Sequence, residues 1–373
     1  MENYSQYIIK CMADKKLENK IKSIGKVKYE LPFINCFVLE INNKNKDILR
    51  QLCDSKLIYK NTNIAAQMNT AKKTVKADLV NNKGYTGYGV SICILDTGIC
   101  PVKDFNYPDN RIIAFKDFVK NKSRPYDDNG HGTHVAGIAA GNGFLSNKKY
   151  SGIAPEANII SLKILDKDGQ GNSADVLGGL QWILDNKKKF NIKIINLSIG
   201  THDEDKNDPL VQAVENLWDN GITVVTAAGN NGPEKSSITS PGVSKKVITV
   251  GASDDHKTVS IWGDTLINFS GRGPTLECII KPDIIAPGTN IISCRSHDAK
   301  NLKLINNNYA VMSGTSMSTP IITGAIALLL QKRPDLEPNQ IKLKLKKSTV
   351  NLNYAQNQQG WGLIDIKKFV LEE

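Results

Sequence analysis

The chain has 373 residues, of which 40% are hydrophobic and 23% are charged, and its formal net charge is +11. This composition excludes disordered, collagen-like and disulfide-scaffold proteins, and the length allows one large core or two domains. Much of the positive charge lies in scattered lysines beside asparagines, as in "NNKNKD". Such a pattern predicts solvated surface and no specific nucleic-acid partner.

The sequence shows no sign of export or membrane insertion. Its start, "MENYSQYIIKCMADKK", has no long apolar stretch before a small-residue cleavage site, and no segment reaches the ~18 apolar residues of a membrane span. The 7 cysteines form no CxxC pair, which is typical of reduced, buried thiols rather than of a disulfide or zinc framework. We therefore expect a cytoplasmic protein with no membrane partner, with non-standard export as the exception.

Residues 1–62 alternate short strand-like and helix-like stretches, among them "QYIIKCM", "KLENKIKSI", "CFVLEI" and "KDILRQL". Their order is strand, helix, strand, strand, helix, strand, which predicts a small ferredoxin-like α+β domain. Residues 63–76 are polar with few apolar anchors, and we interpret them as a linker. Residues 77–373 then form the larger domain.

The larger domain alternates β-branched runs with helical patterns. "VSICILD", "NIISLKIL", "IKIINLSIG", "GITVVTAAG" and "KVITVGA" predict strands that are buried on both faces. "GTHVAGIAAG", "SADVLGGLQWILDNK" and "DPLVQAVENLWDNG" predict the helices between them. This order predicts an α/β fold in which helices cover both sides of a mostly parallel sheet, with ligands beyond the carboxyl ends of the strands.

Three clusters of polar residues lie next to predicted core segments, where packing alone does not require them. Asp96 follows a strand in "ILDTGI", His131 lies between glycines in "DDNGHGTHVAG", and Ser316 precedes an apolar helix in "SGTSMSTP". Each has a structural alternative, because an aspartate after a strand often caps a turn and a serine often caps a helix. His131 and His134 could also suggest a metal pair, but no HExxH spacing accompanies them.

Together these residues supply an acid, a base and a nucleophile. A serine hydroxyl needs a base to take its proton, and the imidazole needs a carboxylate to fix its tautomer. Asn230, in "VVTAAGNNGP", has the composition of a turn, but its amide could also donate to the oxyanion of a tetrahedral intermediate.

These motifs, in this order, resemble the subtilisin-like serine peptidases: "DTG", "HGTHVAG", "AAGN" and "GTSMSTP". The resemblance implies a subtilisin-like three-layer fold and a serine endopeptidase that forms an acyl-enzyme on Ser316, with Asp96 and His131 completing the triad and Asn230 in the oxyanion hole. It also implies that polypeptide substrates bind as an added strand. The residues implied to bind substrate are Ser198, Ile199, Gly200, Gly169, Gln170, Gly171, Ala227, Ala228 and Gly229.

The N-terminal domain is similar to the propeptide of that family. This similarity implies a zymogen in which the domain inhibits the enzyme until Ser316 cuts the linker, within residues 64–73. The alternative is a domain that stays attached as a regulatory module. No cofactor is implied for the chemistry. Structural calcium is possible, although "GNGFLSNKKYSG" is unlike the family's calcium loop, Asp104 is not a clean match to a ligand, and the metal ligands are unknown.

Two other functions compete with this interpretation. One is a catalytically silent peptide-binding scaffold of the same fold, and the other is a basic nucleic-acid-binding protein, for which no recognisable module is present. The small residues around Ser198 and Ala227 also predict a pocket with room for a sizeable apolar or aromatic side chain before the cut bond.

Overall fold

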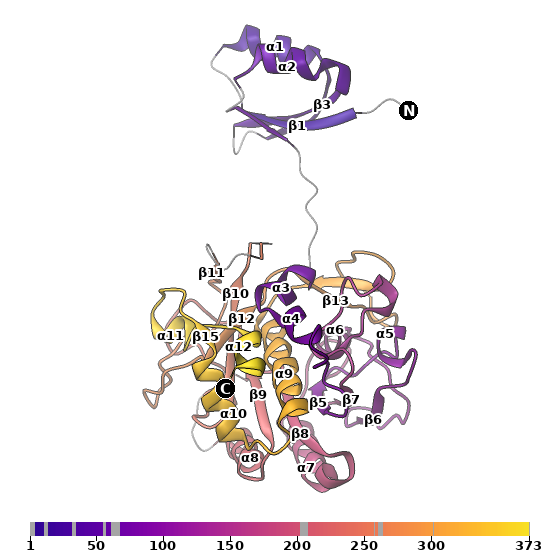
Figure 1. Cartoon of the computed structure of the whole chain (residues 1–373), viewed down its shortest axis with the longest axis vertical. Helices are drawn as coiled ribbons and strands as arrows, with labels where there is room; N and C mark the ends of the chain where they lie inside the picture. The colour runs from indigo at the N-terminus through magenta and orange to yellow at the C-terminus, as the bar shows by residue number, and fades with distance from the viewer. Residues whose placement is uncertain are drawn as a thin grey trace. The chain divides into compact units, whose positions relative to one another are not determined.

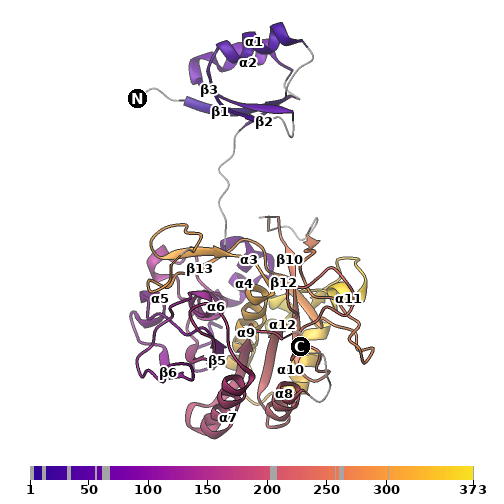
Figure 2. The ribbon, with the colours of Figure 1, turned by 180° about the vertical axis from the view of Figure 1, so that it is seen from behind.

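The computed structural model describes residues 4–10, 14–31, 35–54, 57–60, 68–201, 208–256, 258–259, 264–300 and 302–372. The chain divides into two compact units, Met1–Ala65 and Ala66–Glu373. Figures 1 and 2 show the elements of both from opposite sides.

The first unit is a 4-stranded antiparallel sheet, with strand order β2-β3-β1-β4, that packs against two helices. Strand residues two apart, such as Leu39 and Ile41, point to one face, where they pack with Ile21 and Leu49 of the helices. The predicted order of elements is the one found: β1 (Tyr4–Lys10), α1 (Lys15–Ser23), β2 (Lys26–Leu31), β3 (Cys36–Asn42), α2 (Lys46–Leu52) and β4 (Ile58–Lys60), with a 3₁₀ turn at Asn43–Asn45.

The second unit is built on a 10-stranded sheet of order β15-β16-β12-β10-β9-β8-β5-β7-β6, with β11 paired to β10. All neighbours are parallel except β10 with β11 and β15 with β16. The strands are β5 (Ser91–Asp96), β6 (Ile112–Asp117), β7 (Asn158–Lys163), β8 (Ile192–Leu197), β9 (Thr223–Ala227), β10 (Ile248–Asp254), β11 (Thr265–Leu266), β12 (Ile284–Pro287), β15 (Thr349–Val350) and β16 (Leu363–Ile364). A separate hairpin joins β13 (Ile291–Cys294) to β14 (Tyr309–Met312).

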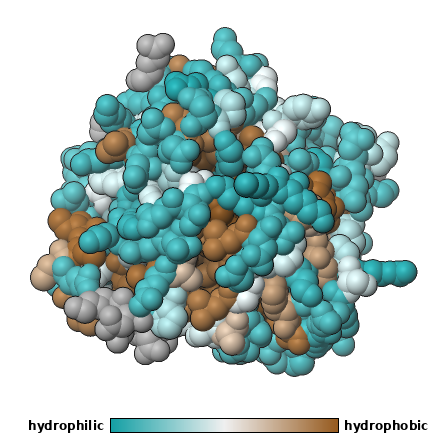
Figure 3. All heavy atoms as spheres, turned by 90° about the horizontal axis from the view of Figure 1, so that it is seen from below, coloured by the Kyte–Doolittle hydropathy of each residue, from teal (hydrophilic) through white to brown (hydrophobic). Residues whose placement is uncertain are grey.

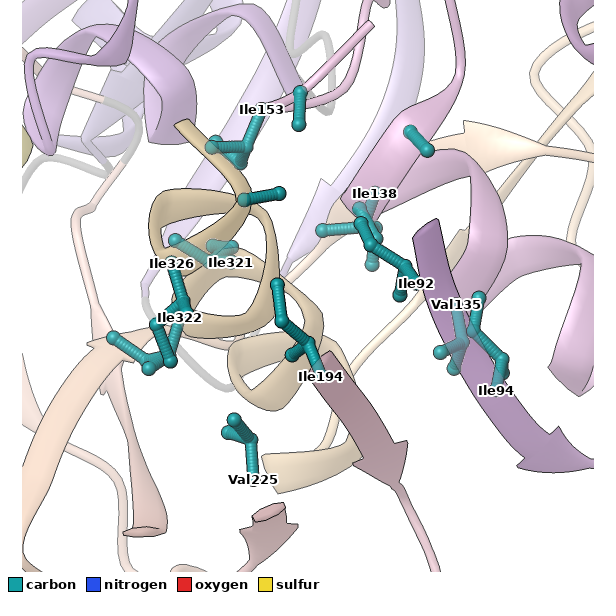
Figure 4. Close-up of a cluster of buried hydrophobic side chains, with 14 of the residues drawn as sticks. Ile92, Ile94, Val135, Ile138, Ile153, Ile194, Val225, Ile321, Ile322 and Ile326 are labelled. Carbon is teal, nitrogen blue, oxygen red and sulfur yellow. The ribbon is translucent and has the colours of Figure 1, made fainter. Parts of the chain in front are cut away.

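Helices cover both faces of this sheet, as predicted. The helices of the second unit are α3 (Met68–Thr74), α4 (Ala77–Asn81), α5 (Lys103–Asn106), α6 (His131–Ala140), α7 (Ser173–Phe190), α8 (Pro209–Asp219), α9 (Thr315–Lys332), α10 (Pro338–Lys347), α11 (Gln356–Gln359) and α12 (Ile366–Leu371), with a 3₁₀ turn at Phe144–Ser146. Ile92 and Ile94 of β5 lie in one buried cluster with α6 and α9 (Figure 4). Leu95 points the other way, where a methyl group on Gly179 of α7 would lie 3.3 Å from it.

Small residues bring α6 and α9 into the centre of the unit. A methyl group on Gly137 of α6 would lie 2.2 Å from Ser293 Oγ, and one on Gly324 of α9 would lie 2.6 Å from Ile153 Cβ. Larger side chains at these positions would push the helices away from their neighbours. The helices that begin at His131 and just before Ser316 are therefore held rigidly against the core.

The predicted linker is wrong over residues 68–76, because Met68–Thr74 form helix α3. Ala71 and Val75, four residues apart, are fully buried in the core of the second unit. Lys72 Nζ donates to Gly152 O at 2.8 Å, and Thr74 Oγ1 donates to Thr258 O at 3.0 Å. Small apolar residues were enough to anchor this helix, while residues 63–67 lie outside the described part of the chain.

The face in Figure 3 is largely hydrophilic, and its hydrophobic residues lie in small patches separated by polar ones. Among the described residues, no helix has the length and apolar character needed to cross a membrane.

Candidate active site

A cleft of about 850 Å³ opens at the carboxyl ends of the parallel strands in the second unit. His131 at the start of α6, Ser316 at the start of α9 and Asn230 after β9 all line it. Asp96, the last residue of β5, lies behind His131 and is only 1% exposed. Residues that are far apart in the sequence therefore meet at one edge of the sheet.

Asp96 and His131 form a direct pair. Asp96 Oδ1 lies 2.7 Å from His131 Nδ1 and also accepts the Thr97 backbone N–H at 2.7 Å. Burial lowers the pKa of His131, but the charge of Asp96 and its hydrogen bond outweigh that effect and raise the pKa above 6.5. With Nδ1–H donating to the carboxylate, Nε2 is left as the acceptor of the ring.

Asp127 holds the segment around this pair, and the sequence analysis missed it. Its fully buried carboxylate accepts from Thr97 Oγ1 at 2.8 Å, from the Gly130 N–H at 2.7 Å and from the Thr133 N–H at 2.8 Å. It thus joins the residue after Asp96 to the first turn of α6, where negative charge is favourable. An aspartate just before a helix start, in "DDNGHG", was the available signal.

Four residues with hydroxyl groups lie at the start of α9: Thr315, Ser316, Ser318 and Thr319. Thr315, Ser318 and Thr319 use their hydroxyls internally, on Asn230 Oδ1 at 3.0 Å, Ala286 O at 2.9 Å and Thr315 O at 2.8 Å. The capping residue is Gly314, which provides no side-chain cap. Ser316 is different because its hydroxyl lies in the cleft, where it donates to Ser198 O at 3.3 Å.

Ser316 and His131 line the same cleft, but no hydrogen bond joins these two described residues in this structure. Catalytic hydrogen bonds are often long in the absence of substrate and shorten when it binds. The structure therefore brings the predicted base, His131, and the predicted nucleophile, Ser316, into one site, without a direct hydrogen bond between them.

Pro320 lies inside α9, beyond its first turn. Because proline has no N–H, the Ser316 carbonyl four residues earlier loses its helical hydrogen bond. The Ser198 hydroxyl donates to that carbonyl at 3.2 Å instead. Ser198 and Ser316 are therefore joined by two hydrogen bonds, one in each direction.

Asn230 is oriented by the same helix start. Its Oδ1 accepts both the backbone N–H and the hydroxyl of Thr315, each at 3.0 Å. The amide oxygen is thereby fixed, so the NH₂ group is left to donate to a ligand in the cleft. This is the arrangement that an oxyanion hole requires of a side-chain amide.

Most of the predicted substrate-binding residues line the cleft: Ser198, Ile199, Gly200, Gly169, Gln170, Gly171, Ala227 and Gly229. Ala228 does not, because it is fully buried and its N–H and C=O bond Val250 O at 2.9 Å and the Thr239 N–H at 3.1 Å.

The family resemblance implies that residues 168–171 form the strand on the other side of the substrate, but the segment before Gly171 is a turn. Asp166 Oδ1 accepts the N–H groups of Asp168 and Gln170 at 2.9 and 3.0 Å, and Asp166 N–H donates to Gln170 O at 2.8 Å. The backbone of Gln170 is therefore already engaged, because an aspartate side chain can capture the N–H groups that follow it.

His134 has a structural role in the core. It is fully buried, its Nε2–H donates to Ile291 O and Ala310 O at 3.2 Å each, and burial lowers its pKa to about 3. The ring is therefore neutral and its donor is occupied. Among the described residues, no group of three or more His, Cys, Asp or Glu side chains is placed to hold a metal ion.

Comparisons with known proteins show the family of the chain. A model of the subtilase family matches residues 87–362. Serine protease AprX of Bacillus subtilis (strain 168) is 44% identical over 91% of this chain and 79% of its own, and subtilisin DY of Bacillus licheniformis is 33% identical over 79% of this chain and 95% of its own. The solved structure of a cold adapted subtilisin-like serine proteinase matches with a TM-score of 0.58 and 29% identity, covering 75% of this chain and 88% of that one.

The predicted family, fold and enzyme class are confirmed by these matches. The family match spans most of the second unit and includes the cleft with His131 and Asn230. The chain belongs to the subtilase family and is a subtilisin-like serine endopeptidase.

Proposed function

We propose that this endopeptidase works through an Asp96–His131–Ser316 triad. The observation that carries the proposal is the 2.7 Å contact between Asp96 and His131 in a cleft that also holds Ser316. Nε2 of His131 takes the proton of Ser316 as Oγ attacks the peptide carbonyl, and the proton then passes to the leaving amine. The acyl-enzyme that remains is released by water, with His131 again as the base.

The oxyanion forms beside two donors, the Asn230 amide and the Ser316 backbone N–H at the start of α9. The dipole of α9 adds to their effect, because its N-terminus carries partial positive charge. The substrate backbone lies along Ser198, Ile199 and Gly200, as an added strand beyond the end of β8. Extended segments of unfolded or loop regions are therefore the expected substrates.

We further propose that the chain is made as a zymogen, with the first unit as an intramolecular inhibitor. Ser316 then removes this unit by cutting before α3. The packing of Ala71 and Val75 in the catalytic core supports that limit, because an extended peptide is needed in the cleft. The predicted cut region of residues 64–73 is therefore narrowed to residues 64–67, which lie outside the described part of the chain.

Intact-mass measurement of freshly purified wild type and Ser316→Ala protein tests this function. We expect wild type to lose its first unit and to keep α3, while Ser316→Ala stays at full length. If both are cut alike, another protease does the processing and self-maturation fails. If both stay whole, a fluorogenic peptide assay on the same samples separates an active enzyme with a retained regulatory domain from a silent scaffold.

The described residues around Asp104 do not fit the structural calcium that the family implies. One oxygen of the Asp104 carboxylate accepts the Leu145 N–H at 2.9 Å, and the other accepts the Tyr309 hydroxyl at 2.7 Å. Nearby, the buried Arg111 guanidinium donates to Ala140 O at the end of α6 at 2.7 Å and to Ala157 O at 2.8 Å. A cation from the chain itself therefore binds carbonyl oxygens, which are the kind of ligand that calcium prefers.

Chelation should therefore have little effect on stability. We expect EDTA to change the unfolding midpoint of Ser316→Ala protein, chosen to prevent autolysis, by less than about 2 °C, which corresponds to less than about 1 kcal/mol. Differential scanning calorimetry with EDTA or with added calcium measures this change. A midpoint that rises and saturates with added calcium would contradict the prediction.

We also propose that the enzyme acts in a reducing compartment such as the cytoplasm. Among the described cysteines, Cys53, Cys93, Cys100, Cys278 and Cys294 are free thiols, which supports this proposal. Its partners are then polypeptide substrates and its own first unit.

A further inference from the structure

Thr239 is among the side chains that line the cleft and that the mechanism leaves unused. Thr239 lies between the two strand ends that lead to the reacting groups, with Gly200 after β8 on one side and Gly229 after β9 on the other. A methyl group on Gly200 would lie 2.1 Å from Thr239 Oγ1, and one on Gly229 would lie 2.6 Å from both Oγ1 and Cγ2. The side chain of Thr239 therefore occupies the space between these two glycines.

The backbone of Thr239 cannot easily move aside. Its N–H donates to Ala228 O at 3.1 Å, and its C=O accepts the Gly242 N–H at 2.8 Å. The next residue, Ser240, exchanges backbone hydrogen bonds with Thr201 at 3.0 and 3.1 Å. The β-branched side chain also has few rotamers, so both the position and the shape of Thr239 are fixed.

The hydroxyl of Thr239 plays no part in holding it there. The residue is 6% exposed, and Oγ1 has no hydrogen-bond partner among the described residues. What Thr239 contributes to the cleft is volume. Valine, which has nearly the same shape, should therefore replace it, while glycine should leave an open space between the strand ends.

This space lies where a substrate side chain must go. Gly229 directly precedes Asn230, and Ser198 O is 3.3 Å from Ser316 Oγ, so both walls begin at the reacting groups. A peptide whose carbonyl sits between Ser316 and Asn230 directs the side chain of that residue between the walls. We propose that Thr239 makes this pocket shallow, so that the enzyme cuts after small residues and rejects large apolar or aromatic ones.

This proposal reverses the expectation of a roomy pocket, which considered only the residues of the two walls. It rests on the proposed function, because it uses Ser316 and Asn230 as the cutting centre. Steric exclusion from an apolar pocket typically changes relative rates by about 10- to 200-fold per methylene. An effect of that size is easily measured.

The test compares wild type, Thr239→Gly and Thr239→Val on peptides that differ only in having Ala, Leu or Phe before the cut bond. We expect wild type to favour Ala over Phe in kcat/KM by about tenfold or more, and Thr239→Gly to raise the Phe-to-Ala ratio by at least about tenfold. Thr239→Val should keep the wild-type order. Thr239→Ala gives an intermediate opening if the glycine variant folds poorly, as judged by its unfolding midpoint.

Three results would overturn the proposal: wild type that prefers Phe, a ratio that does not change in Thr239→Gly and Thr239→Ala, or a valine variant that behaves like glycine. Calorimetric binding of peptides that end in Ala or Phe to the same proteins gives the same ratio without turnover. If no peptide is cut but the binding ratio shifts as expected, the proposed triad fails and the pocket assignment stands. If peptides are cut and neither ratio shifts, the triad stands and the pocket assignment fails.

Discussion

Ser316→Ala should lower the turnover of an extended fluorogenic peptide by about a millionfold, the loss measured for the corresponding change in subtilisin and borrowed here for its family. The other hydroxyls at the start of α9 are bonded within the protein, so none of them can replace the one in the cleft. Single-turnover kinetics on matured enzyme, or on a sample from which the first unit has been removed by another protease, measure the loss.

Ser318→Ala is the matched control. Ser318 is two residues further along the same helix, fully buried, and donates to Ala286 O at 2.9 Å. Losing this bond should cost about 1 kcal/mol of stability and leave turnover nearly unchanged. Equal losses of turnover in both variants would mean that the start of α9, and not the Ser316 hydroxyl, is what matters.

Asp96→Asn should lower turnover by about ten-thousandfold, because an amide favours the wrong tautomer of His131. The acid limb of the pH profile should also move. A general base works only when neutral, so wild-type kcat/KM rises as pH increases through the pKa of His131, which Asp96 raises. Without the carboxylate that pKa falls, so the limb should shift to lower pH while the plateau drops. Initial rates across pH on both proteins measure the two effects.

Asp117→Asn controls for an aspartate that only caps a turn. Asp117 also ends a parallel strand, β6, and its carboxylate accepts the N–H groups of Val119 and Lys120 at 2.9 and 3.0 Å, away from the cleft. Its loss should lower the unfolding midpoint and leave the pH profile unchanged. A profile for Asp96→Asn that matched the Asp117→Asn profile would show that Asp96 is also just a turn cap.

The sheet, its helices and the site motifs could be predicted from sequence because each has a local cause. Apolar runs such as the one ending at Asp96 are long enough to identify buried strands. The glycines on both sides of His131 form part of a motif that is distinctive enough to identify the site. What could not be predicted depends on contacts between distant segments. Thr239 looks like an ordinary turn residue until β8 and β9 are placed side by side, and Asp127 gains its importance from Thr97.

The missed helix α3 has the same kind of explanation. Its sequence is polar with a few small apolar residues. The helix is held because Ala71 and Val75 pack into the hydrophobic core of the second unit, which the local sequence does not reveal. The turn before Gly171 differs, because Asp166 could have suggested it locally. The family resemblance predicts a strand in that segment, whereas the aspartate captures the N–H groups that follow it.

The Arg111 guanidinium at the end of α6 has a consequence for how the enzyme responds to its surroundings. A bound ion stabilises a fold only in proportion to the logarithm of its free concentration over its dissociation constant. A cation that is part of the polypeptide cannot dissociate or be diluted, so its contribution does not follow mass action. The contribution of Arg111 to holding the end of the helix that begins at His131 is therefore independent of the calcium concentration.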